Sequence, residues 1–226
     1  MQAEPAPLFE PTQRISGRLV AAVWIVGIIV VVISSAIAFD GEVDPWERSA
    51  LLWFNGWPDF LEPIFWVIQQ FGVTLAPVIA AVIVFYKTRN WWHLIAISAI
   101  LPAKLLLEKG IVKQLVQRNR PFQSVGPEIN VRGPAFEGLA FPSGHTTTAV
   151  ALGLLLIAFV PKKWKPVVLF FGFMTPIIRL YYGEHNILDV VAGTALGSMF
   201  AVGLWFTLVN RLVDTKPAPT EANQAP

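Results

Sequence analysis

The chain contains no cysteine and few charged residues. Without cysteine it can form neither a disulfide framework nor a thiolate metal site. Charged residues make up only 14% of the sequence, whereas hydrophobic residues make up 54% and the mean hydropathy is +0.57. These values are too apolar for an ordinary soluble domain, so the composition predicts an integral membrane protein.

The apolar residues are gathered into runs separated by polar connections. The first run, residues 17–39, is long enough to span a bilayer. Five more runs follow, of which the fourth spans only if its flanks extend it: 66–86, 91–107, 143–160, 167–178 and 187–213. We therefore predict an all-α, polytopic membrane protein, a six-transmembrane-helix bundle that forms one domain over residues 14–213.

The two ends of the chain differ in composition from this predicted domain. Residues 1–13 and 214–226 are polar and rich in proline, which is typical of disordered tails. The tripeptide 36–38, after the first run, resembles a signal-peptidase site. Because the run is long for a signal peptide and cleavage would leave five spans, we favour an uncleaved first helix.

Charge is distributed unevenly between the predicted connections. With a cytoplasmic N-terminus and alternating spans, the cytoplasmic side receives Arg14, Arg18, Lys87, Arg89, Lys162, Lys163, Lys165, Arg211 and Lys216. The other side receives mainly acidic residues, Asp40, Glu42, Asp44, Glu47, Asp59 and Glu62. This agrees with the positive-inside rule and predicts a cell (inner) membrane protein with both termini cytoplasmic.

Residues 40–65 mix acidic side chains with tryptophan and phenylalanine. An aromatic, amphipathic stretch beside a span is typical of an interfacial helix with its rings at headgroup depth. Such a helix either anchors the protein at the interface or guides a lipid toward a site, and we favour anchoring.

Three polar motifs follow the second apolar run, and all are predicted on the extracytoplasmic side. The first is Lys113, six residues, then Arg120-Pro121. If the third span continues this far, seven residues bring both cations to one helix face, where they suit a dianionic phosphoryl group, and Pro121 then ends the helix. The alternative is contact with lipid headgroups.

The second motif, Pro142-Ser143-Gly144-His145, opens the fourth apolar run. Ser143 is a good N-cap, and the amides of a helix N-terminus bind anions. Gly144 allows close approach to a phosphate, and His145 lies where it can donate a proton to a leaving oxygen. The alternative is a capped helix start with an incidental histidine.

The third motif is Arg179, five residues, His185, three residues, then Asp189. A helical start to the last span would put His185 and Asp189 on one face, where the carboxylate fixes the imidazole tautomer and leaves the other nitrogen free to attack. The alternative is a local pair that caps a helix. Two histidines and an aspartate could also ligate zinc, but the three nearby cations would repel it.

Three further charged residues lie near these motifs. Lys104 and Glu108 are four apart, so we expect them to pair within a helix. Glu184 precedes His185 and could tune its charge, but we expect it to be solvated.

Together the three motifs resemble the signature of the type 2 phosphatidic acid phosphatase, or lipid phosphate phosphatase, superfamily, bacterial membrane-bound type. That signature is Lys, six residues, Arg-Pro; then Pro-Ser-Gly-His; then Ser-Arg, five residues, His, three residues, Asp. The resemblance covers about residues 60–210. Ile178 replaces the family serine, which would remove one hydroxyl contact to phosphate.

The resemblance implies a role for each matching residue. His185 would be the nucleophile that forms a phosphohistidine, Asp189 would orient it, and His145 would protonate the leaving group and then activate water. The phosphoryl oxygens would contact Lys113, Arg120, Ser143, Gly144 and Arg179. No metal or other cofactor and no nucleic acid are implied, and the partners are the bilayer and a lipid phosphate.

Three functions fit these observations. The first is a lipid phosphatase acting on a polyprenyl diphosphate, phosphatidylglycerol phosphate or phosphatidic acid, of which the first fits an outer-face site best. The second is a phosphotransferase that passes the group to another lipid or a sugar. The third is a non-catalytic protein that binds or transports lipid phosphates.

Overall fold

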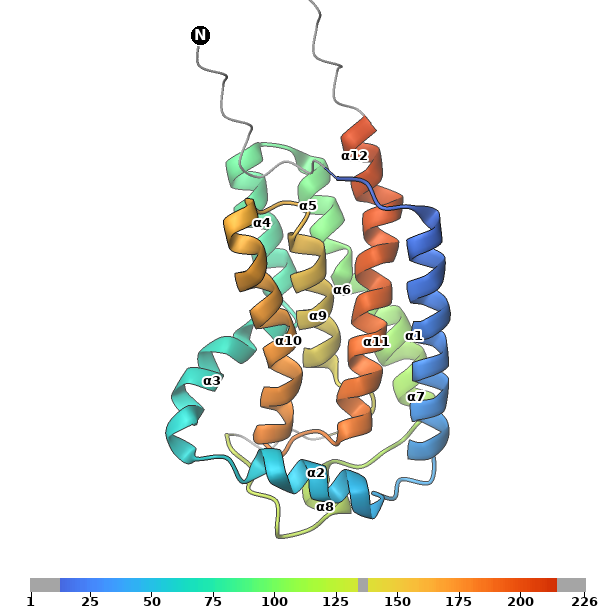
Figure 1. Ribbon diagram of the computed structural model, residues 1–226, viewed down its shortest axis with the longest axis vertical. Coiled ribbons are helices and arrows are strands. Elements are labelled where there is room, and N and C mark those ends of the chain that lie inside the picture. Colours follow the sequence, from blue (N-terminus) through green and yellow to red (C-terminus); the bar gives the residue numbers. More distant parts are fainter. Residues whose placement is uncertain (1–12, 134–137, 215–226) are drawn as a thin grey trace, which may run out of the picture.

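The computed structural model of the chain describes residues 13–133 and 138–214 (Figure 1). The predicted tails lie outside these ranges apart from Gln13 and Asp214. Within the described ranges there are helices and no β-strand, which confirms the all-α class. The main helices are α1 (Gly17–Ala38), α2 (Pro45–Asn55), α3 (Glu62–Gln69), α4 (Ala76–Thr88), α5 (Trp91–Ser98), α6 (Ile100–Ala103), α7 (Lys113–Leu115), α8 (Pro121–Ser124), α9 (Gly144–Leu156), α10 (Lys165–Tyr181), α11 (Ile187–Leu204) and α12 (Asn210–Asp214).

Two of these helices are long and apolar enough to cross a membrane, namely α1 and the helix that runs over residues 187–212. A third crossing results if α3 and α4, which are bent by 73° at a short break, are counted as one span. The chain is therefore a helical membrane protein by the length and composition of these segments.

Helix α9 lies at the centre of the bundle and packs against α10 and α11, with α1 on the far side of α11 (Figure 1). Its residues from Thr146 to Gly153 are buried, because a helix that is apolar around its whole circumference has no face suited to water. The N-termini of α9 and α11 and the C-terminus of α10 meet at one end of the bundle, which α2 and α8 cover. All three motifs are therefore brought to that end.

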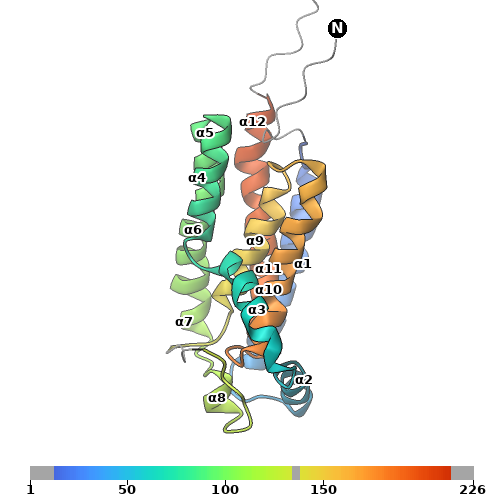
Figure 2. The same ribbon diagram turned by 90° about the vertical axis from the view of Figure 1, so that its left-hand side faces the viewer.

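The predicted run 66–86 is not one helix. Helix α3 ends at Gln69, a 3₁₀ turn (Gln70–Gly72) follows, and α4 starts at Ala76. Figure 2 shows α3 crossing obliquely toward α10, while α4 lies antiparallel beside α5. A proline in the first turn of α4 suits a new helix start, since its missing amide hydrogen is one that a helix N-terminus leaves unbonded.

The helix that contains the predicted third span also departs from regular geometry. Residues Lys104–Val112 form a π-helix, which α7 continues only to Leu115. The expectation that Lys113 and Arg120 share a helix face is therefore wrong, because Val116 is extended and the helix ends before Arg120. Pro121 does not end that helix either, but starts α8.

The π-helix changes which side chains face inward. Lys104 and Lys113 are nine residues apart, which is two and a half turns of α-helix and would place them on opposite faces. With i to i+5 bonding, nine residues are about two turns, so both lysines face the same side. That side is the wall of the candidate site.

Candidate active site

A cavity of about 230 Å³ opens at the end of the bundle where the three motifs meet. Residues of all three motifs line it, namely Lys113, Arg120, Gly144, His145 and His185. The opposite wall comes from the helix break and the π-helix, through Thr74, Lys104, Leu105, Glu108 and Lys109. Segments more than a hundred residues apart in sequence thus form one polar cavity, with cations and two imidazoles facing it.

His185 and Asp189 lie together, although not for the predicted reason. Helix α11 begins at Ile187, so His185 precedes it and Asn186 is the N-cap. Asp189 reaches back from the first turn, where its Oδ2 accepts from the amide of Asn186 at 2.7 Å and lies 3.5 Å from Nδ1 of His185. A helix-capping carboxylate therefore lies beside the imidazole, whose Nδ1 makes no hydrogen bond within the described residues.

The His185 ring is buried in the connection between α10 and α11, where Gly183 adopts a φ of 67° that glycine tolerates best. Burial lowers the pKa of His185 well below its ordinary value, and the nearby cations Arg179, Arg120 and Lys113 lower it further. This environment therefore disfavours the charged, imidazolium form of His185.

Asp189 belongs to a buried ionic cluster that sequence reasoning missed. Arg118 donates to both carboxylate oxygens of Glu47, at 2.9 and 2.6 Å, and lies 3.4 Å from Oδ1 of Asp189. Glu47 also accepts from the amide of Leu188 at 2.8 Å. All three charged side chains are fully buried. The helix expected to serve as an interfacial anchor, α2, thus supplies a carboxylate beneath the site.

The Pro-Ser-Gly-His motif has a partly different geometry from the expected one. Ser143 is the N-cap of α9, but its hydroxyl makes no capping bond, and Oγ is buried with no hydrogen-bond partner among the described residues. Its amide donates to the carbonyl of Asp189 at 2.9 Å, which joins the second motif to the third. His145 is half-buried in the first turn and faces the cavity, as predicted.

The side chains of Arg120 and Arg179 both contact Glu184. Glu184 is buried, whereas the sequence predicted a solvated side chain. Its carboxylate contacts the Nη2 of Arg179 and lies 3.7 Å from Nη1 of Arg120. Arg120 also donates to the backbone carbonyl of Glu184 at 3.0 Å and to that of Gly138 at 3.1 Å. Arg179 donates to Gln69, a polar residue within the predicted apolar run 66–86, at 2.6 Å. Polar side chains within a span are often functional. The polar character of Gln69 is therefore the feature of the sequence that could have indicated its place in the site.

The expected intrahelical pair of Lys104 and Glu108 faces the cavity instead. Lys104 donates to the hydroxyl of Thr74 at 3.1 Å, and Glu108 lies 3.8 Å from Nζ of Lys113. Both side chains lie against Gly144, where any Cβ would come within 3.2 Å of them. The glycine therefore makes room for this wall of the cavity.

Ile178, which stands in place of the family serine, does not face the cavity. Its side chain is fully buried in an apolar cluster with Phe65, Ile68, Tyr181 and Tyr182. The substitution therefore contributes to packing between α10 and α3.

These features define a helical membrane protein with a polar, cation-lined cavity beside a histidine–aspartate pair. Residues 91–212 match the PAP2 superfamily, and the chain belongs to this superfamily. The match covers the π-helix, Arg179, and the Arg120, His145 and His185 that line the cavity.

Several named proteins are similar to this chain in sequence or in structure. A lipid A 4'-phosphatase from Bacteroides thetaiotaomicron is 26% identical over 176 residues, which are 74% of this chain and 78% of that protein. An undecaprenyl-diphosphatase from Sulfolobus acidocaldarius is 30% identical over 127 residues, 54% of this chain and 57% of that protein. The crystal structure of a PAP2 type phosphatidylglycerolphosphate phosphatase from Bacillus subtilis is similar with a TM-score of 0.47 and 20% identity, over 86% of this chain and 96% of that one.

Glu47→Gln is predicted to destabilise the protein and to impair the site, because it leaves Arg118 buried with a weakened partner. Breaking a buried pair costs about 3–5 kcal/mol of unfolding free energy. The neighbouring change Arg48→Gln is the control, since Arg48 pairs with Glu128 at 2.5 Å and both side chains are exposed, so it should cost under about 1 kcal/mol. Denaturant unfolding in detergent measures both, and equal effects would contradict the cluster's importance.

Ile178→Ser, which restores the family residue, is predicted to lower stability without improving phosphate binding. It removes apolar volume from a fully buried position and buries a hydroxyl, which together cost about 2–5 kcal/mol. Thermal unfolding and inhibition by inorganic phosphate provide the two measurements. Tighter phosphate inhibition in the variant would show that position 178 reaches the cavity after all.

Proposed function

We propose that the chain is an integral membrane lipid phosphatase that hydrolyses a phosphomonoester or diphosphate of a membrane lipid through a phosphohistidine. The observation that carries this proposal is the cavity that His185, which lies 3.5 Å from Asp189, lines together with Lys113, Arg120 and His145. The named relatives, a lipid A 4'-phosphatase and an undecaprenyl-diphosphatase, support the same class of reaction.

In the first step the Nε2 of His185 attacks phosphorus, since Nδ1 is the nitrogen turned toward Asp189. An N–P bond forms as the P–O bond to the lipid breaks, and the leaving oxygen takes a proton from His145. In the second step His145 takes a proton from water, whose oxygen forms the new P–O bond. The N–P bond then breaks, which releases inorganic phosphate and restores neutral His185.

The phosphoryl oxygens would be bound by cations and by the start of α9. Lys113 and Arg120 line the cavity, and the hydroxyl of Ser143 has a hydrogen bond still to make. With the Gly144 amide and Arg179 they would stabilise the charge that develops in the transition state. Because these donors supply the positive charge a metal would otherwise provide, we propose that the reaction needs no metal ion.

The proposed membrane arrangement follows from the helix ends. The site lies at the end of the bundle opposite to the start of α1 and to α12 (Figure 1). With the lysine- and arginine-rich connections in the cytoplasm, the six apolar segments would form one domain over residues 14–213, and both termini would be cytoplasmic. The site would then lie on the extracytoplasmic face of the cell membrane, with α2 at the interface.

Phosphate release by the purified protein in detergent tests the proposal. The substrates are a polyprenyl diphosphate, phosphatidylglycerol phosphate and phosphatidic acid, each with and without EDTA. We expect release that EDTA does not change, that His185→Ala abolishes, and that His145→Ala slows by about 10²–10⁴-fold through loss of the general acid.

Three other outcomes would contradict parts of the proposal. Full activity of His185→Ala would exclude the phosphohistidine, and inhibition by EDTA would exclude a metal-free reaction. Phosphate found on a second lipid instead of in solution would identify a phosphotransferase.

A further inference from the structure

The break between α3 and α4 touches the candidate site at three successive points. Gln69 accepts from Arg179 at 2.6 Å, and Lys104 donates to Thr74 at 3.1 Å. Between them Gly72 lies directly against His145, since a Cβ at this position would be 2.6 Å from the His145 carbonyl oxygen. The broken span is therefore fixed against the cations and against the motif that carries His145.

An apolar groove of about 560 Å³ spans the same break and continues along α4. Its floor consists of buried side chains of α9, Leu152 and Leu156, and its rim of the exposed Ile79 and Ile83. Val67, Gln70 and Phe71 line it before the break, and Val73 lines it at the break, whereas the next residue, Thr74, lines the polar cavity. The two hollows are therefore adjacent, one lined by cations and the other by hydrocarbon.

We propose that this groove between α4 and α9 binds the hydrocarbon chain of the lipid whose phosphate occupies the cavity. The inference rests on the proposed lipid phosphatase function. Because a bilayer is as apolar as the groove, the gain is not from removing the chain from water but from fixing its position by packing. A chain held along α4 would place its phosphate beside Thr74 and Lys104, facing His185.

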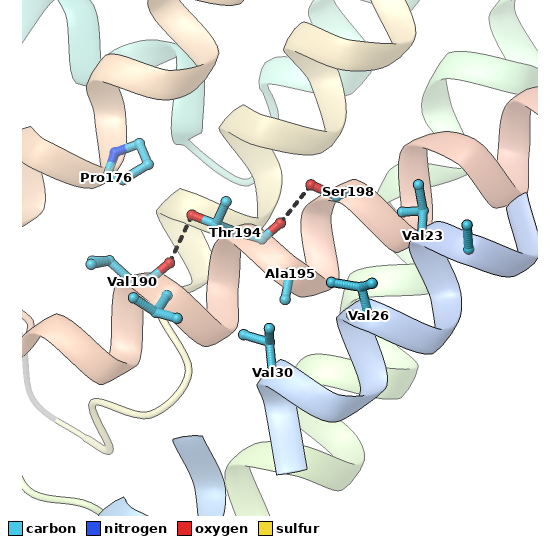
Figure 3. Close-up of a pocket in the computed structure, with 11 residues that line it drawn as sticks. Val23, Val26, Val30, Pro176, Val190, Thr194, Ala195 and Ser198 are labelled. Carbon is cyan, nitrogen blue, oxygen red and sulfur yellow. Dashed lines mark hydrogen bonds between the residues drawn. The ribbon is translucent and has the colours of Figure 1, made fainter. Parts of the chain in front are cut away.

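A second apolar groove provides the comparison (Figure 3). It has a volume of about 650 Å³ and lies between α1, α10 and α11, where Val26, Val30 and Ala195 line it. Its two hydroxyls, on Thr194 and Ser198, already donate to helix carbonyls at 2.8 and 2.9 Å. No residue that lines this groove is a sequence neighbour of one that lines the cavity. We therefore assign the chain to the α4 groove alone.

The test replaces one half-buried alanine in each groove by a larger side chain. Ala80→Phe obstructs the α4 groove, and Ala195→Phe is the matched control in the other one. Phosphate release is measured on dipalmitoyl and dibutyryl phosphatidic acid in mixed micelles, and the ratio of the two kcat/KM values is compared with wild type. We expect Ala80→Phe to lower this ratio by about 10–100-fold, as a misplaced substrate would, and Ala195→Phe to leave it unchanged.

An unchanged ratio in Ala80→Phe, or a lower ratio in Ala195→Phe, would overturn the assignment. If Ala80→Phe abolishes activity on both substrates, the same ratio is measured with Ala80→Val, because a smaller side chain narrows the groove with less strain. A lowered ratio in Ala80→Val supports the proposal, and an unchanged ratio overturns it. If the wild-type protein does not hydrolyse phosphatidic acid, the same ratio is measured with long-chain and short-chain polyprenyl diphosphates or phosphatidylglycerol phosphates, and absence of release from all of these lipids would contradict the proposed function itself.

Discussion

The site depends on one buried ionic cluster formed by Arg118, Glu47 and Asp189. Isolated charges inside an apolar protein are expensive, and these three are stable only because Arg118 donates to both carboxylates and each carboxylate also accepts from a backbone amide. The cluster joins the helix α2, the connection after α7 and the start of α11. It also fixes the carboxylate that lies 3.5 Å from Nδ1 of His185, so the interaction that closes this end of the bundle holds Asp189 in the position that the proposed mechanism requires.

Two departures from regular helix geometry build the wall opposite the histidines. The π-helix over Lys104–Val112 turns Lys104 and Lys113 to one face, which an α-helix would not do. The break after Gln69 brings a polar segment against Arg179 and opens the apolar groove along α4. A polar cavity and an apolar groove thus meet at one irregular point, as a substrate with a charged head and a hydrocarbon chain would require.

The sequence predicts the helical class and the meeting of the three motifs, because apolar runs of known length bring their ends to the same side. It does not predict the partners of the motif residues. Arg118 and Glu47 are 71 residues apart, and Arg179 and Gln69 are 110 apart, so no local spacing relates them. The burial of Glu184 follows from its contact with two arginines that only the folded chain brings together. Pro102 and Gly110 lie before and within the π-helix, but such residues also occur in bent α-helices, so they do not identify it.

Rapid-quench trapping of the phosphorylated enzyme tests the central claim most directly. Wild-type protein would be mixed with radiolabelled lipid phosphate, quenched in alkali, where phosphohistidine survives, and mapped by peptide. We predict label on the peptide that contains His185, none on the peptide that contains His145, and label that appears and decays within one turnover. Label on another residue, or no label while phosphate is released, would contradict a phosphohistidine at His185.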